Sequence, residues 1–131
     1  MSFCTAINCM DGRVQLPVIE YLMKRFDARW VDEITEPGPN GILARGNDEI
    51  LVGSIMSRLA ISVEKHGSSG IAVVGHHDCA GNPGGRDKQD ADTRAAVAFV
   101  RRAYPDLPAI GLWLGDDWRV VEIDAGDRSA R

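Results

Sequence analysis

The 131-residue sequence has few cysteines, no long apolar run and no excess of basic charge. Three cysteines are an odd number and too few for the disulfide framework of a small secreted domain, which favours a reducing compartment. The longest uninterrupted apolar run covers only residues 95–100, whereas a membrane-spanning helix needs about 20 apolar residues. The N-terminus also lacks the basic and apolar regions of a signal peptide. We therefore expect a cytoplasmic protein with no membrane partner.

The charge balance gives no sign of a polyanionic partner. There are 15 basic and 19 acidic residues, so the net charge at pH 7 is −4. A nucleic-acid-binding protein usually presents a basic patch or stripe, but the basic residues are scattered along this chain. The length, together with 44% hydrophobic and 26% charged residues, is ordinary for one globular domain. We expect a single domain over residues 1–131 that binds no nucleic acid.

Strand-like and helix-like patterns alternate along the chain. We expect strands at 3–7, 29–34, 71–74, 109–114 and 119–123, helices at 17–26, 48–66 and 91–104, and a turn-rich loop at 36–41. In the long helix, Asn47 or Asp48 is the expected cap and Gly67 the expected terminator. This order predicts an α/β fold, with a mainly parallel sheet flanked by helices and a late antiparallel edge strand.

Two of the expected strands are followed by residues that bind metals. Cys9 follows the first strand, and His76 and Cys79 follow the apolar strand at 71–74. Because ligands bind beyond the carboxyl ends of parallel strands, we expect these three side chains to converge there. Two sulfurs and one imidazole nitrogen suit zinc, and three protein ligands leave a fourth tetrahedral position open, as in a catalytic site.

The motifs Cys9-x-Asp11-x-Arg13 and His76-x-x-Cys79 resemble those of the β-class carbonic anhydrases, and the late hairpin at 110–123 is similar too. The chain looks like a short, divergent member of that family. The resemblance implies one zinc ion per chain, held by Cys9, His76 and Cys79. It also implies reversible hydration of carbon dioxide to bicarbonate by a zinc-bound hydroxide, in a homodimer or higher homo-oligomer.

The same resemblance gives Asp11 and Arg13 a role in catalysis. Asp11 is expected to accept a proton from the zinc water and to orient that water, while Arg13 holds Asp11 by charge-assisted hydrogen bonds. In some members the aspartate itself takes the fourth zinc position. Either arrangement is open to this sequence.

Other functions are compatible with the same residues. The site could bind zinc without hydrating carbon dioxide, as a sensor or binding module, or could hydrolyse small carbon–sulfur analogues of carbon dioxide. The stretch 77–86 also superficially suggests a cysteine phosphatase loop. That loop needs His next to Cys and five residues between Cys and Arg, whereas one residue separates His77 from Cys79 and six separate Cys79 from Arg86.

Simple structural roles are expected for several other conspicuous residues. Cys4 lies within the first expected strand and should be part of the core. His66 ends the long helix, where a cation suits the helix dipole, and Asp78 is expected to cap a turn. His77 is expected at the surface, with proton transfer or metal ligation as alternatives. The three tryptophans, Trp30, Trp113 and Trp118, are expected in the core or at an interface.

Overall fold

The computed structural model describes residues 2–123, in which five strands form one sheet. The strands are β1 (Phe3–Cys9), β2 (Trp30–Glu36), β3 (Ile71–His76), β4 (Ala109–Leu114) and β5 (Val120–Ile123). Their order across the sheet is β2-β1-β3-β4-β5. The first four strands are parallel, and β5 pairs with β4 in the antiparallel sense. The predicted α/β fold with a late antiparallel edge strand is confirmed.

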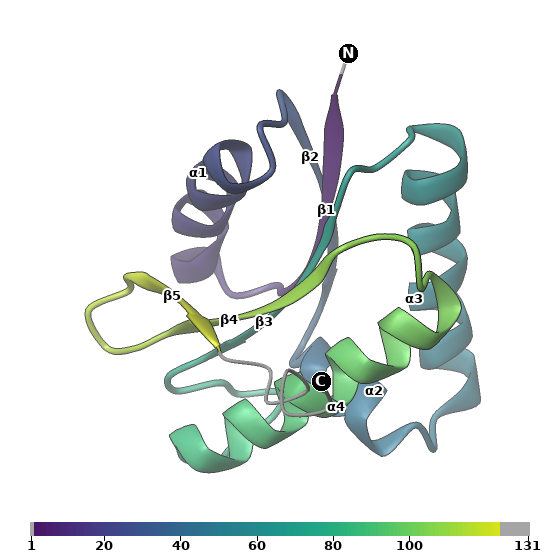
Figure 1. Ribbon diagram of the computed structural model, residues 1–131. Coiled ribbons are helices and arrows are strands. Elements are labelled where there is room, and N and C mark those ends of the chain that lie inside the picture. The colour runs from purple at the N-terminus through teal and green to yellow at the C-terminus, as the bar shows by residue number, and fades with distance from the viewer. Residues whose placement is uncertain (1, 124–131) are drawn as a thin grey trace, which may run out of the picture.

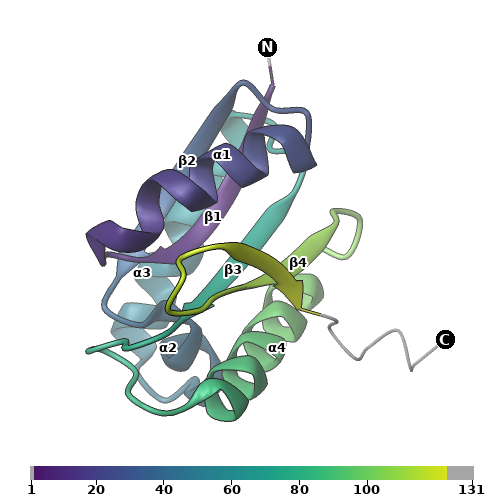
Figure 2. The same cartoon turned by 90° about the vertical axis from the view of Figure 1, so that its left-hand side faces the viewer.

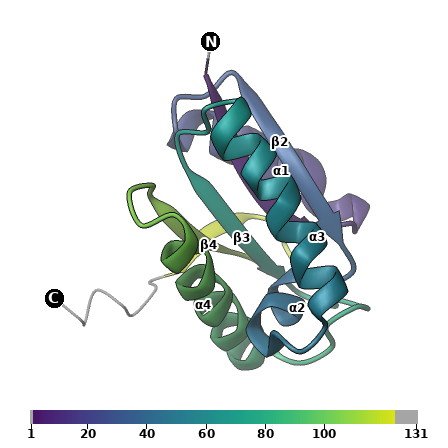
Figure 3. The same cartoon turned by 90° about the vertical axis from the view of Figure 1, so that its right-hand side faces the viewer.

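Helices cover both faces of the sheet (Figure 1). The helical segments are the 3-10 turn η1 (Gly12–Val14), α1 (Gln15–Arg25), α2 (Pro39–Arg45), α3 (Glu49–Ala60), the π-helical turn η2 (Ile61–Lys65) and α4 (Arg86–Ala103). Helix α1 covers one face (Figure 2), and α2, α3 and α4 cover the other (Figure 3). Among residues 2–123, no helix has both the length and the apolar character needed to cross a bilayer.

The sheet lies between two apolar layers. Under α1, the buried side chains of Val18 and Leu22 pack against Cys4, Ala72 and Leu112 of the sheet. The layer on the other face is built from α3, α4 and the strands, and includes Ile7, Ile55, Leu59, Val73 and Val97. Burying each large aliphatic side chain stabilises the fold by about 1.5–3 kcal/mol. Strands β1 and β3 are covered on both sides, which explains why almost every residue in them is buried.

The prediction of a loop over residues 36–41 is wrong, because α2 begins inside this range at Pro39. Gly38 has a left-handed backbone with φ of +63°, and Pro39 is well suited to the first helical turn. A Cβ atom on Gly38 or Gly41 would come within 2.7 Å or 2.6 Å of Asn82, respectively. These turn-forming residues therefore start a short helix that packs closely against the loop after β3.

The other expected elements exist, with shifted ends. Asp48 is the cap of α3, since its Oδ1 accepts a hydrogen bond of 3.0 Å from the Leu51 backbone N–H. Gly67, with φ of +69°, follows the helix as expected. Helix α4 begins at Arg86 rather than 91. Strands β1 and β3 run on to Cys9 and His76, so two of the candidate ligands are the last residues of strands.

Candidate metal centre

Three candidate ligands meet at the carboxyl end of the sheet. Cys9 ends β1, His76 ends the neighbouring parallel strand β3, and Cys79 lies in the turn that follows. Their ligand atoms all lie within 4.8 Å of one another, and the Sγ atoms of Cys9 and Cys79 are 3.9 Å apart. All three residues are at most 4% exposed. Within residues 2–123, this is the one group of at least three His, Cys, Asp or Glu side chains placed to hold a metal ion.

The hydrogen bonding of His76 leaves a donor atom directed at this centre. Its Nδ1 atom lies 2.7 Å from the backbone oxygen of His77, a contact that requires the proton on Nδ1. Its Nε2 atom is buried without a hydrogen-bond partner. An unpaired buried polar atom costs about 1–3 kcal/mol, which a ligand at that atom removes. One free imidazole nitrogen beside two sulfurs is a donor set that fits zinc.

The two sulfurs favour one negative charge between them. The Cys79 thiol lowers the pKa of Cys9, and His76 lowers it further, against the opposing effect of burial. The nearby Cys9 sulfur and burial together raise the pKa of Cys79. Burial lowers the pKa of His76, but Cys9 and the His77 carbonyl outweigh it, so the net shift is upward. A cation between the sulfurs favours loss of the second thiol proton.

Asp11 and Arg13 form an ion pair on the η1 turn, beside Cys9. The Arg13 side chain donates to Asp11 Oδ1 from Nε at 3.1 Å and to Oδ2 from Nη2 at 2.7 Å. The Arg13 backbone N–H also donates to Oδ1 at 2.9 Å. These interactions lower the pKa of Asp11 to about 2, although burial opposes them. Asp11 is therefore a carboxylate at neutral pH and can only accept hydrogen bonds.

A glutamine braces the segment that carries Cys9 and Asp11. Gln15 Nε2 donates to the backbone oxygens of Cys9 at 2.7 Å and of Asp11 at 3.1 Å. One amide group thus ties the end of β1 to the turn that follows it. This residue has no motif signature and was not predicted.

A buried amide network fixes the loop after β3, and it too was not predicted. Asn82 donates to Asn40 Oδ1 at 3.2 Å, and its backbone oxygen accepts from Gln89 Nε2 at 2.6 Å. Asn40 in turn donates to Gln89 and to Thr93, at 2.9 Å and 3.1 Å. The signal available in the sequence is that Gln89 and Thr93 are four residues apart and interrupt the apolar stripe of α4. Asn82 is thus an anchor of the loop at 82–86.

A cavity of about 210 Å³ opens beside the candidate ligands. It is lined by Cys9, Met10, Asp11, Pro37, Ala80 and Gly81. A Cβ atom on Gly81 would come within 2.4 Å of the Pro37 backbone, so glycine is needed for the two loops to meet. Carbon atoms form most of this lining and Asp11 supplies a charge, which suits a small apolar molecule held next to a polar reacting group.

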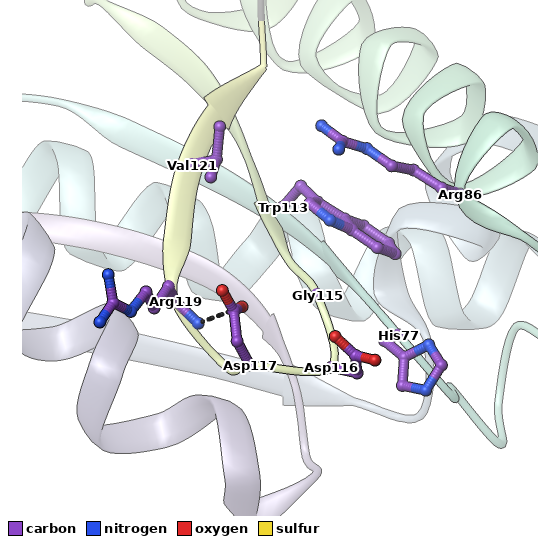
Figure 4. Close-up of a pocket in the computed structure, with 8 residues that line it drawn as sticks. All are labelled: His77, Arg86, Trp113, Gly115, Asp116, Asp117, Arg119 and Val121. Atoms are coloured by element: carbon purple, nitrogen blue, oxygen red, sulfur yellow. Dashed lines mark hydrogen bonds between the residues drawn. The ribbon is translucent and has the colours of Figure 1, made fainter.

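A second cavity, of about 370 Å³, lies along the β4–β5 hairpin (Figure 4). Its lining includes His77, Arg86, Trp113 and Asp116, with His77 and Asp116 near each other in the view. His77 is exposed and stands outside the group of candidate ligands. Arg86 lines this cavity while Cys79 belongs to the cysteine–histidine group, so the geometry gives no support to a phosphatase loop.

The remaining residues singled out in the sequence differ in burial, and some of them lie outside the core. Cys4 is fully buried in the core, as expected. His66 contacts Asp32 through Nδ1 at 2.6 Å and is not among the candidate ligands. Trp113 is buried, but Trp30 is 45% exposed. Trp118 is half-buried against the Arg13 guanidinium, with 4.3 Å between Arg13 Cζ and the ring centroid.

The chain is similar to known proteins in sequence and in fold. The chain matches the protein family described as "Putative carbonic anhydrase" over residues 1–124. No curated protein matches it.

Several solved structures share the fold. The carbonic anhydrase of Streptococcus mutans is 19% identical, with a TM-score of 0.63, 92% of this chain covered and 81% of the other. The β-carbonic anhydrase CafA of Aspergillus fumigatus is 16% identical, with a TM-score of 0.54 and coverage of 93% and 75%. A β-carbonic anhydrase of Sordaria macrospora, one of two described as tetrameric, is 15% identical, with a TM-score of 0.53 and coverage of 92% and 80%.

Proposed function

The chain belongs to the carbonic anhydrase family, and from this premise we propose that it is a zinc-dependent enzyme that reversibly hydrates carbon dioxide to bicarbonate. The observation that carries the proposal is the unpaired, buried Nε2 atom of His76 beside two cysteine sulfurs. Cys9, His76 and Cys79 are the residues that would hold one zinc ion. A zinc ion held there would act as a Lewis acid and lower the pKa of water to about 7.

Asp11 is the residue we assign to the attacking water. Asp11 lines the 210 Å³ cavity, and its low pKa keeps the carboxylate able to accept a proton in a hydrogen bond. A water that donates one hydrogen to Asp11 has a lone pair left to face the substrate. Arg13 holds both carboxylate oxygens, so the direction from which Asp11 accepts is restricted.

The cavity supports carbon dioxide as the substrate. Carbon dioxide is small, linear and apolar, which matches a lining formed by Met10, Pro37, Ala80 and Gly81 around one carboxylate. Bicarbonate is an anion, so the ionised Asp11 repels the product and favours its release.

The decisive experiment combines metal analysis with hydration kinetics on the same purified protein. We expect about one zinc per chain. In stopped-flow assays with a pH indicator, the zinc-loaded protein should hydrate carbon dioxide well above the buffer rate, and a chelator should abolish this activity. A rate equal to buffer at one zinc per chain would overturn the hydratase proposal. Activity on carbon disulfide in that protein would indicate a hydrolase of carbon–sulfur analogues, and inactivity on both would indicate a zinc-binding module.

We further propose that the chain assembles with copies of itself. The support is its fold, shared with the Sordaria macrospora enzymes that are described as tetrameric. Light scattering coupled to size-exclusion chromatography measures the mass in solution. A mass near that of one 14.2 kDa chain would contradict the assembly proposal.

A further inference from the structure

The guanidinium of Arg13 is held from three sides, by residues from three separate segments. Asp11, before η1, accepts from Nη2 at 2.7 Å. Asp78, in the turn after β3, accepts from Nη1 through Oδ2 at 3.4 Å and from Nη2 through its backbone oxygen at 3.2 Å. The Trp118 ring, from the β4–β5 hairpin, lies 4.3 Å from Arg13 Cζ. Carboxylate and carbonyl oxygens thus bind the guanidinium nitrogens, while the guanidinium carbon lies over the indole ring.

Two of these contacts come from residues with an unusual backbone conformation. Asp78 has φ of +59° and Trp118 has φ of +57°, and residues 2–123 contain just one other non-glycine residue with positive φ, Asp27. A left-handed backbone is unfavourable for a bulky residue such as tryptophan and persists only where the surroundings impose it. The turn that imposes it is closed by the hydrogen bond from the Trp118 N–H to the Gly115 oxygen, at 3.0 Å.

The hairpin has two sides with different surroundings. Asp116, Asp117 and Arg119 line the 370 Å³ cavity seen in Figure 4, and Trp118 is not part of that lining. Trp118 instead packs against the apolar layer that contains Cys9 and Cys79. Its ring centroid is also 6.1 Å from that of His76. The left-handed turn therefore places one aromatic ring against both the Asp11–Arg13 pair and a candidate ligand.

We propose that Trp118 is a positioning residue for the Asp11–Arg13 pair. The indole face holds the plane of the Arg13 guanidinium, and the guanidinium in turn sets the orientation of the Asp11 carboxylate. This inference rests on the proposed function for its kinetic consequence, but the placement of Arg13 by Trp118 can be tested without turnover. Trp118 does not line the 210 Å³ cavity, so it acts through Arg13 rather than on the substrate.

Two substitutions separate an aromatic face from simple apolar bulk. Trp118→Phe keeps a ring face for the guanidinium, whereas Trp118→Leu keeps an apolar side chain without one. Trp30→Leu is a matched control, because Trp30 also lies beside an arginine, with 5.2 Å from Arg29 Cζ to its ring centroid. Trp30 is at the start of β2, at the opposite end of the sheet from the candidate metal centre.

The first measurement is the nuclear magnetic resonance signal of the Arg13 Nε–Hε group, assigned with Arg13→Lys. In the wild type we expect a ring-current shift and slow exchange with water, since Nε donates to Asp11 under the indole. Trp118→Leu should remove the shift and speed exchange at least threefold. Trp118→Phe and Trp30→Leu should keep slow exchange.

An unchanged Arg13 signal in Trp118→Leu, or equally fast exchange in Trp118→Phe, would overturn the inference. Trp118→Met replaces the leucine variant if that variant does not fold.

The second measurement is the hydration rate of the zinc-loaded variants. Trp118→Leu should lower kcat about tenfold at unchanged KM and unchanged zinc content, and Trp118→Phe should restore most of kcat. A rise in KM alone, or loss of zinc, would contradict action through Arg13. If the wild type itself does not hydrate carbon dioxide, the proposed function fails, while the Arg13 signal still decides whether Trp118 positions the ion pair.

Discussion

Two buried polar triplets occupy opposite ends of the same pair of strands, β1 and β3. Near the amino end, Thr5 of β1 meets Ser62 and Ser68, with Oγ–Oγ distances of 2.6 Å and 2.7 Å. At the carboxyl end, Cys9 meets His76 and Cys79. Both groups are almost fully buried, with side chains at most 4% exposed. Burial is therefore alike in the two triplets, and hydrogen bonding is what differs.

The triplet at the amino end is satisfied by the protein itself. Ser62 donates to Asp32 at 2.7 Å and Ser68 donates to the Gly70 oxygen at 2.9 Å, so each hydroxyl has a partner. The triplet at the carboxyl end leaves His76 Nε2 unpaired. Burying an unpaired polar atom is unfavourable. We therefore infer that the amino-end triplet stabilises the fold and that the carboxyl-end triplet binds a ligand.

The largest effect is expected when a sulfur is removed from the carboxyl-end triplet. Cys79→Ala leaves two of the three proposed ligands, so zinc affinity should fall at least 10³-fold and hydration should be lost. Cys4→Ala is the matched control, because Cys4 is also a buried cysteine and packs in the apolar layer under α1. That control should keep about one zinc per chain and lose about 1 kcal/mol of stability. Equal zinc content in the two variants would remove the distinction between the triplets.

A smaller loss of activity is expected when the carboxyl-end triplet is intact but the neighbouring Asp11 can no longer accept a proton. Asp11→Asn should retain zinc and lower kcat about 10²- to 10³-fold, since an amide replaces the carboxylate that orients the attacking water. Asp27→Asn removes one negative charge from the end of α1 and should leave kcat unchanged. Normal turnover in Asp11→Asn would refute the role of the Asp11–Arg13 pair in catalysis.

Patterns along the sequence were enough to predict the sheet and to predict that the candidate ligands lie close together. The apolar run at 71–74 predicts a strand covered on both faces, and β3 is buried throughout. Once β1 and β3 are parallel neighbours, residues 9 and 76 must lie at the same edge of the sheet. The convergence of Cys9, His76 and Cys79 therefore follows from topology rather than from any local propensity.

The features that were missed depend on contacts between distant segments. Helix α2 contains Gly41 and starts with Pro39 and Asn40, residues that favour turns, and it is held by the bonds of Asn40 to α4. The first turn of α4 is polar, so apolar periodicity does not predict it. An ion pair between Lys88 and Asp92, four residues apart and at 2.8 Å, helps to stabilise this part of the helix. The left-handed backbone of Trp118 has no signature at all in a sequence, because tryptophan rarely adopts it.

Glu33 also has a buried side-chain atom without a partner, and here protonation removes the negative charge that burial disfavours. Its Oε2 atom is buried without a partner, and Asn8 donates to its Oε1 at 3.1 Å. Burial raises the pKa of Glu33 from 4.5 to about 7, although the Asn8 hydrogen bond opposes it. The folded chain thus binds this proton more tightly than the unfolded chain, so stability falls as pH rises from about 4.5 through 7.

Glu33→Gln should remove this part of the pH dependence. The free energy of unfolding of the wild type, relative to the variant, should drop by about 2–3 kcal/mol between pH 4.5 and 8. Urea denaturation of both proteins at several pH values measures the difference, and the exposed Glu20→Gln serves as the control. Parallel pH profiles of wild type and Glu33→Gln would show that folding does not shift the pKa of Glu33.

The smallest effect is expected at the amino-end triplet, and it should be confined to stability. Thr5→Val keeps the shape of the side chain but removes the hydroxyl that joins Ser62 to Ser68, so about 1–2 kcal/mol should be lost. Thr35→Val, at a half-buried position of the edge strand β2, should change stability by less than about 0.5 kcal/mol. Zinc content and kcat should be unaltered in both variants, because every hydroxyl of this triplet is paired within the protein. Loss of zinc in Thr5→Val would mean that the two ends of β1 are coupled. Hydrogen bonding alone would then not distinguish a fully hydrogen-bonded cluster from a ligand site.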